Sequence, residues 1–190
     1  MRKNLKVRFI NKNKVTDGYV YVDGKDFGFE DLVIAPVIEV GDTPVGMAVM
    51  RLTEEMLKEM EMTTEEAVIT GIMNMDYKIV DMCEVIIDMA IKDGMPEELA
   101  RAVFGLESGM YVISTENGVC GAAAVLTAKA ELEQMFPEGY IILPSSIHEM
   151  IAVSAEGKNI DDMKDMVENI NGNVVAEEDR LTDNAYIFIA

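Results

Sequence analysis

The stretch Tyr140-Ile-Ile-Leu-Pro-Ser-Ser-Ile-His-Glu-Met-Ile-Ala-Val-Ser154 joins two β-like segments through a short polar turn. Residues 140–143 and 149–154 are rich in β-branched and aromatic side chains, which predicts two strands. The turn between them holds His148, the single histidine of the chain. We therefore expect this segment to form the central hairpin of the fold and to be the first place to search for a functional site.

The flanking sequence predicts a β-α-β-β-α-β unit around this hairpin. Its expected elements are strands at 110–114, 140–143, 149–154 and 185–189, with helices at 122–136 and 161–170. Asn171-Gly172 is the expected end of the second helix. The order is that of ferredoxin-like split β-α-β units.

The first half of the chain predicts two β-hairpins followed by a helical middle. The first predicted hairpin pairs residues 4–10 with residues 19–23. The second pairs residues 32–40 with residues 45–52 around the turn Gly41-Asp42-Thr43-Pro44. Helices are expected after Thr53, after a Thr63–Glu66 capping box, over 80–92 with a stop at Asp93-Gly94, and over 97–104 with Pro96 as first helical residue and Gly105 at the end. The predicted class is α+β, with a mostly antiparallel sheet, helices packed on it, and one domain over 1–190 that could have lobes at 1–105 and 106–190.

The charge of the chain restricts its partners. It has 35 acidic and 16 basic residues and a net charge of −19, which repels nucleic acid and anionic membrane. Six basic residues nevertheless precede the first acidic residue: Arg2, Lys3, Lys6, Arg8, Lys12 and Lys14. This basic segment either matches the acidic body of the same molecule or forms a contact site for an acidic partner.

Other features of the composition predict a cytoplasmic protein. There is no apolar signal segment at the N-terminus and no window approaching the roughly 20 apolar residues of a membrane helix. Cys83 and Cys120 are isolated and are expected to be reduced thiols. The 16 methionines are interpreted as adaptable core residues, with a Met-lined groove for a peptide or apolar ligand as the alternative.

The turn after residue 144 contains residue types that hydrolases use. Ser145, Ser146, His148 and Glu149 are the weak catalytic candidates, and Cys120 with His148 would be the pair of a thiol enzyme. Neighbours in a tight turn point in different directions, and no Gly-x-Ser-x-Gly motif is present. The simpler interpretation is that Pro144 ends a strand, the serines bond to the turn backbone, and His148 packs beside the sheet.

Neither a metal nor a cofactor is predicted. His148, Glu149, Asp161 and Asp162 could serve a divalent cation, but one histidine without an acidic motif at ligand spacing is a weak pattern. Gly118-Val-Cys-Gly121 before a helix lacks the glycine spacing and the lysine of phosphate-binding loops. A turn that leads into the helix is sufficient explanation.

Four segments closely resemble a family of domains of unknown function from gut Firmicutes, often encoded near phage or conjugative-element genes. They are Met110-Tyr-Val-Ile-Ser114, Gly121-Ala-Ala-Ala-Val-Leu126, Tyr140 to Ile151, and Leu181-Thr-Asp-Asn-Ala-Tyr186. More loosely, Gly46-Met-Ala-Val-Met-Arg-Leu-Thr-Glu-Glu-Met-Leu57 with Thr64-Glu-Glu-Ala67 is similar to an uncharacterised family of Bacillus-type bacteria. The first resemblance implies a polar residue in many relatives where this chain has Cys120, which argues against a catalytic thiol.

From these patterns we expect a non-enzymatic interaction or accessory protein, associated with a mobile element and bound to a protein partner. The alternative is a hydrolase or transferase centred on the Ser145–Glu149 turn. Strand edges near the N-terminus or at 185–189 could support a homodimer.

Overall fold

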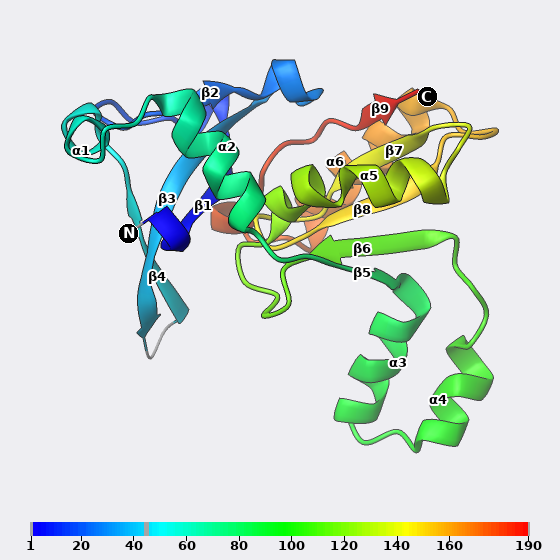
Figure 1. The fold of residues 1–190 in the computed structure, drawn as a ribbon. Helices are drawn as coiled ribbons and strands as arrows, with labels where there is room; N and C mark the ends of the chain where they lie inside the picture. Colours follow the sequence, from blue (N-terminus) through cyan, green and yellow to red (C-terminus); the bar gives the residue numbers. More distant parts are fainter. Residues whose placement is uncertain (1, 44–45, 190) are drawn as a thin grey trace.

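Two antiparallel sheets and six α-helices make up the part of the chain that the computed structural model describes, residues 2–43 and 46–189 (Figure 1). The first sheet, sheet A, contains β1 (Leu5–Asn11), β2 (Val22–Asp23), β3 (Leu32–Thr43) and β4 (Gly46–Arg51). Sheet B contains β5 (Lys78–Asp81), β6 (Met110–Ser114), β7 (Tyr140–Pro144), β8 (Met150–Ser154) and β9 (Tyr186–Phe188). The helices are α1 (Glu54–Glu59), α2 (Thr64–Asn74), α3 (Met82–Lys92), α4 (Glu97–Phe104), α5 (Val125–Met135) and α6 (Ile160–Asn173). The predicted α+β class is confirmed.

Strand β3 is the centre of sheet A. Strand β1 pairs along one of its edges, from Leu5↔Ile38 to Asn11↔Leu32, while β2 and β4 share the other edge. The predicted hairpin between 4–10 and 19–23 is therefore wrong, and only Val22–Asp23 of the second segment is a strand. The long apolar β3 offers both of its edges, so each short segment pairs with β3 instead of with the other.

The second predicted hairpin, β3 with β4, is confirmed. Its register shifts at a bulge between Glu39 and Gly41, where the φ of Gly41 is 144°. Of the expected turn, Gly41 to Thr43 belong to β3, and Pro44 lies outside the described residues.

The helix starts after β4 follow their capping residues. Thr53 caps α1, and Thr63 with Glu66 forms the predicted capping box of α2. Helix α2 lies against β1 so closely that Gly71 leaves no room for a side chain: a Cβ there would be 2.7 Å from the carbonyl oxygen of Lys6.

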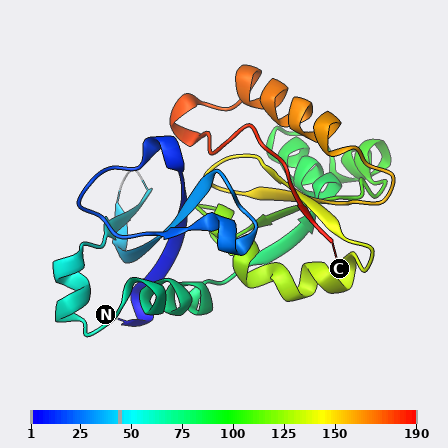
Figure 2. The ribbon, with the colours of Figure 1, turned by 90° about the horizontal axis from the view of Figure 1, so that it is seen from above.

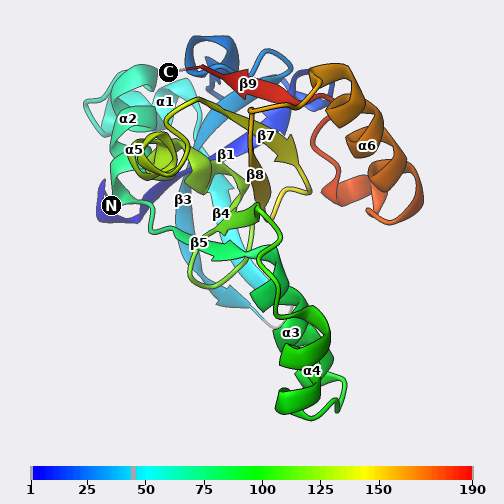
Figure 3. The same ribbon diagram turned by 90° about the vertical axis from the view of Figure 1, so that its right-hand side faces the viewer.

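Sheet B has the strand order β5-β6-β8-β7-β9 and contains the predicted β-α-β-β-α-β unit. Both crossovers, β6-α5-β7 and β8-α6-β9, pass over one antiparallel neighbour in the same direction across the sheet. Because β6 and β8 run in opposite directions and such crossovers are right-handed, the two helices lie on opposite faces (Figures 2 and 3). The sheet is thus covered on both sides, whereas the ferredoxin-like arrangement has both helices on one face.

Strand β5 was not predicted. It pairs with β6 from Lys78↔Ser114 to Asp81↔Tyr111, so the helix expected over 80–92 begins only at Met82. The carboxylate of Asp81 accepts a hydrogen bond from the N–H of Cys83 at 2.8 Å and thereby fixes this start.

Helices α3 and α4 form a hairpin inserted between β5 and β6, and it projects away from the sheets (Figures 1 and 3). The stop at Gly94 is confirmed by its φ of 96°. Pro96 is the N-cap of α4 and not its first helical residue, because its ψ of 136° is non-helical.

Two other boundaries differ from the prediction. Ala122–Ala124 form a short 3₁₀ helix, η4, before α5. Helix α6 continues through Asn171 and Gly172, because the buried Asn171 amide donates to the Thr182 carbonyl at 3.1 Å and to the Asp183 carboxylate at 2.7 Å. Asn171 therefore ties the helix to the following chain and does not end it.

The largest buried cluster draws side chains from both sheets, from α2 and from α5. Its members include Phe9, Ile34, Val68, Ile113, Leu132 and Ile142. A second cluster fills the space between the other face of sheet B and α6. The single domain over 1–190 stays a prediction. No helix among the described residues is both long enough and apolar enough to cross a membrane.

Candidate functional site

The turn between β7 and β8 is held by its own side chains. The Ser145 hydroxyl donates to Glu149 Oε1 at 3.3 Å, and Ser146 Oγ accepts from the backbone N–H of His148 at 3.0 Å. Within the described structure, neither serine hydroxyl forms a hydrogen bond to the imidazole of His148. The four catalytic candidates are therefore neighbours whose contacts are those of a closed polar turn.

The His148 ring contacts two other segments. Its Nδ1 accepts a hydrogen bond from the backbone N–H of Cys120 at 3.0 Å, and its Nε2 lies 3.6 Å from Asp179 Oδ1. Because Nδ1 is an acceptor, the neutral ring carries its proton on Nε2, facing the carboxylate. The ring is thus oriented between Cys120 and Asp179, and its basic nitrogen is occupied by an amide.

Cys120 lies in a tight loop between β6 and η4. Its φ of 51° places a non-glycine residue in the left-handed region, which is uncommon for such residues. The next residue, Gly121, has no space for a side chain, since a Cβ would be 2.5 Å from Ser114 Oγ. The structure brings Cys120 and His148 together, but the atom of Cys120 that contacts the imidazole is the amide nitrogen.

The backbone of the turn connects three segments. The carbonyl of His148 accepts from the Ser114 hydroxyl at 2.7 Å and from the Gly121 N–H at 3.0 Å. The N–H of Ile147 donates to the carbonyl of Asp179 at 2.8 Å, at the end of the 3₁₀ helix η5 (Glu177–Asp179). These backbone hydrogen bonds therefore hold the β7–β8 turn in place against β6, the β6–η4 loop and η5.

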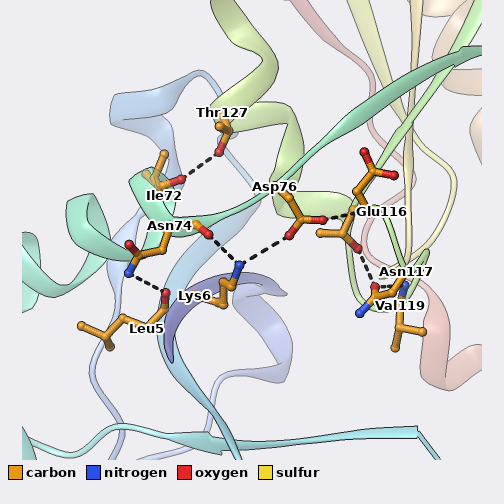
Figure 4. Close-up of polar contacts among 10 residues, drawn as sticks. Leu5, Lys6, Ile72, Asn74, Asp76, Glu116, Asn117, Val119 and Thr127 are labelled. Atoms are coloured by element: carbon orange, nitrogen blue, oxygen red, sulfur yellow. Dashed lines mark hydrogen bonds and ion pairs between the residues drawn. The ribbon is translucent and has the colours of Figure 1, made fainter. Parts of the chain in front are cut away.

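The loop between β6 and η4, which carries Glu116 and Cys120, is also bonded to sheet A and α2 (Figure 4). The Lys6 ammonium donates to the carbonyl of Asn74 at 2.6 Å and pairs with Asp76 at 3.4 Å, and Asp76 accepts from the N–H of Glu116 at 2.8 Å. Burial would raise the pKa of the Asp76 carboxyl, but the Glu116 N–H, its own N–H and the Lys6 ammonium together hold this pKa below its ordinary value. The ionised form of Asp76 thus links the two sheets.

A pocket of about 190 Å³ opens between the β7–β8 turn with its neighbouring β6–η4 loop and the adjacent face of sheet A. Its apolar surface includes Val37, Val49 and Leu181, and Cys120 and Ile147 also line it. Four basic side chains line it, against a single carboxylate, that of Glu178; the basic ones are Arg8, Lys14, Arg51 and Arg180. We call this cavity the basic pocket and these four residues its basic members.

Neutral contacts position three members of the basic pocket. Arg51 donates to the Thr16 hydroxyl at 3.1 Å and lies over the Tyr19 ring, and Arg180 Nε donates to the Val175 carbonyl at 2.9 Å. Lys14 donates to the carbonyls of Glu177 and Arg180. Among the described residues, no member forms an ion pair with a carboxylate.

A larger hollow of about 660 Å³ continues from the basic pocket. The two share Asn11, Lys14, Arg180 and Leu181, and the hollow adds acidic as well as basic side chains, among them Lys12 and Asp31. Sequence patterns indicated Arg8 and Lys14 through the basic N-terminal segment. Nothing in the sequence marked Arg51 or Arg180, whose meeting depends on the tertiary structure.

The four residues considered for a cation, His148, Glu149, Asp161 and Asp162, do not come together in one site. Asp161 and Asp162 begin α6, away from the turn that carries His148 and Glu149. No group of three or more His, Cys, Asp or Glu side chains in the described segments is placed to hold a metal ion.

Two antiparallel sheets, a closed polar turn and a basic pocket define an acidic α+β protein with a candidate binding site for an anionic group. A family model described as a family of unknown function, DUF5688, matches residues 1–189, and the chain belongs to that family. No curated protein and no solved structure matches the chain.

Proposed function

We propose that this protein is a non-enzymatic, cytoplasmic interaction protein that binds a carboxylate group of a protein partner in the basic pocket. The observation that carries the proposal is the convergence of Arg8, Lys14, Arg51 and Arg180 on one small pocket, where none of the four pairs with a carboxylate of residues 2–41 or 48–189. In a chain of net charge −19, this arrangement is the reverse of the average surface.

Electrostatics supports an anionic ligand. Like charges held close together repel each other, and a bound anion removes this cost. Arginine is suited to the role because its planar guanidinium binds a carboxylate through two parallel hydrogen bonds. The pocket therefore favours a localised anion, whereas the acidic body of the protein disfavours a long polyanion such as nucleic acid.

The size and lining of the pocket suggest how the anion is carried. A volume of about 190 Å³ is small for a complete drug-sized ligand, which ordinarily occupies about 300–1,000 Å³. Val37, Val49 and Leu181 provide an apolar wall beside the basic groups. A carboxylate next to an apolar side chain fits this combination, with the rest of the partner segment in the adjoining hollow.

The resemblance to a gut Firmicutes family near phage or conjugative-element genes supports a partner encoded by a mobile element. The alternative function, a hydrolase or transferase centred on Ser145–Glu149, receives less support. Its serines bond to Glu149 and to backbone, and the His148 Nδ1 is occupied by the Cys120 amide.

Binding of a labelled peptide tests the proposal. The probe is a fluorescent hexapeptide of alternating Glu and Leu, and its control has Gln in place of Glu. We expect the Glu peptide to bind the full chain, the Gln peptide not to bind, and the Arg8→Gln/Arg51→Gln variant to bind at least about tenfold more weakly, the equivalent of 1.4 kcal/mol. Lys92→Gln/Arg101→Gln, the same change of two charges on the distant α3–α4 hairpin, should bind as the wild type does.

Equal binding of both peptides, or wild-type affinity in the double variant, would overturn the proposal. A single-stranded oligonucleotide that bound in the Arg8- and Arg51-dependent manner instead of the peptide would show that the ligand class is wrong.

A further inference from the structure

The α3–α4 hairpin is the part of the fold that the two sheets do not cover. Ile87 of α3 and Ala100 of α4 are fully buried, and the two helices pack against each other. Arg101 also pairs with Glu84 across the hairpin at 3.2 Å and with Glu97 at 2.9 Å. The two helices run antiparallel as the hairpin leaves the body of the protein (Figure 3).

One side of the hairpin is apolar and exposed to solvent. Ile87 and Ala100 mark the lines along which the helices meet. Each residue of a helix is rotated by about 100° from the one before it, so the other positions can be assigned to one side of the hairpin or the other. Ile86 and Met89 of α3 and Leu99 and Val103 of α4 fall on the same side. We call these four residues the hairpin face.

The exposures agree with this assignment. Met89 is 59% exposed, Leu99 51% and Val103 56%. On the opposite side lie Glu84 and Arg101, whose ion pair shows that these two positions face the same way. A helix pair that carries apolar residues on its free side has an unused packing surface.

The charges around the hairpin face select among the occupants. Residues 82–107 contain six carboxylates and two basic side chains; Glu84 and Glu97 pair with Arg101 on the side opposite the hairpin face, which leaves four carboxylates against Lys92 in the rest of the segment. A second copy of this chain would present the same excess of carboxylates and would be repelled. A helix with basic residues beside an apolar stripe would be complementary in charge as well as in hydrophobicity.

The dimensions also favour a helix. The eleven residues of α3 span about 16 Å, at about 1.5 Å per residue. The surface between two antiparallel helices is a shallow groove, and a third helix of about three or four turns would cover the hairpin face along its length. Methionine at this surface allows the contact to adapt to the partner.

We propose that the α3–α4 hairpin is a docking surface for a basic amphipathic helix of another protein, with Ile86, Met89, Leu99 and Val103 against its apolar stripe. The inference shares with the proposed function the idea of an interaction protein, but it does not depend on the basic pocket. The hairpin lies at the far end of β5 and β6 from the β6–η4 loop that carries Cys120.

The probe is a labelled 14-residue peptide of Lys and Leu with its leucines at helical spacing, titrated against the full chain by fluorescence anisotropy. Its control is a peptide of the same composition in scrambled order. We expect the amphipathic peptide to bind at least tenfold more tightly than the scrambled one.

The variant Leu99→Glu/Val103→Glu separates docking from simple charge attraction. It adds two carboxylates, so attraction alone would strengthen binding of the cationic peptide, whereas loss of the apolar contact should weaken it at least tenfold. Ala130→Glu is the charge control, because Ala130 is exposed on α5, outside the hairpin, and the change adds the same charge per site. It should bind no more weakly than the wild type.

Circular dichroism confirms that each variant is folded, and Leu99→Ser/Val103→Ser replaces the glutamate variant if that one is not. Equal binding of the scrambled peptide, or undiminished binding by the double variant, would contradict the proposal. Self-association of the wild type that the double variant abolishes, measured by analytical ultracentrifugation, would show instead that the occupant is a second copy. Arg8→Gln/Arg51→Gln should not weaken binding of the Lys/Leu peptide, which separates this test from that of the basic pocket.

Discussion

Replacement of Gly71 by alanine should destabilise the protein, although the same change stabilises most helices. Gly71 lies in α2, where it faces β1. An added Cβ would meet the carbonyl oxygen of Lys6 at 2.7 Å, the side chain of Val7 at 2.8 Å and the carbonyl carbon of Lys6 at 2.9 Å. Two of these atoms are backbone atoms of a strand that is paired along its whole length with β3, so they cannot turn aside.

Two effects of opposite sign decide the magnitude. Alanine is favoured over glycine in a helix interior by about 1 kcal/mol. Overpacking of a close contact costs about 1–3 kcal/mol, and the cost here should lie in the upper part of this range, about 2–3 kcal/mol, because α2 as a whole must move away from β1. We therefore expect Gly71→Ala to lower the free energy of unfolding by about 1–2 kcal/mol, or the melting temperature by roughly 2–8 °C for a chain of this size.

Gly172 provides the matched control. It lies in α6, and a Cβ built on it has no heavy atom within 4 Å. Gly172→Ala should raise the free energy of unfolding by about 0.5–1 kcal/mol. Urea unfolding followed by far-ultraviolet circular dichroism measures both variants. If Gly71→Ala were as stable as the wild type or more stable, the proposed close approach of α2 and β1 would be refuted.

Two further predictions concern local contacts. Thr63→Ala removes the capping box of α2 and should cost about 1 kcal/mol in urea unfolding, whereas Thr64→Ala, one residue later, should cost much less. Asp76→Asn should lower the free energy of unfolding at pH 7 by about 0.5–1 kcal/mol, a modest value because the Asp76 side chain is 47% exposed. Since the pKa of Asp76 is lower in the folded state than its ordinary value of 3.8, its contribution is complete above about pH 4 and is lost as the pH falls through the folded pKa. The difference between Asp76→Asn and the wild type should thus shrink in acid-titrated melts below pH 4, and a constant difference down to pH 2 would count against the Lys6–Asp76–Glu116 link.

Features fixed by neighbours in sequence could be predicted. The Thr63–Glu66 box, the stop at Gly94 and the order of elements after residue 110 depend on residues a few positions apart, and all are found. The 145–149 turn was likewise predictable as a turn, because Pro144 and the two serines specify it locally.

Features that depend on distant pairing could not be predicted in the same way. Strand β1 pairs with β3 and not with β2. This pairing depends on the length and burial of β3, which no local sequence pattern expresses. Strand β5 is four residues long and merges with the helix pattern that follows it. The basic pocket unites residues 8, 14, 51 and 180, whose proximity arises only when the two sheets meet.

The position of the α3–α4 hairpin has a consequence for how the chain can change length. Asp81 and Tyr111 face each other on adjacent antiparallel strands, so the hairpin occupies the place of an ordinary turn between β5 and β6. Residues can be added or removed there without altering the register of either strand or the order of sheet B. The hairpin is therefore an insertion site, where a segment of another length or a reporter domain can be placed with the least disturbance to the remaining fold.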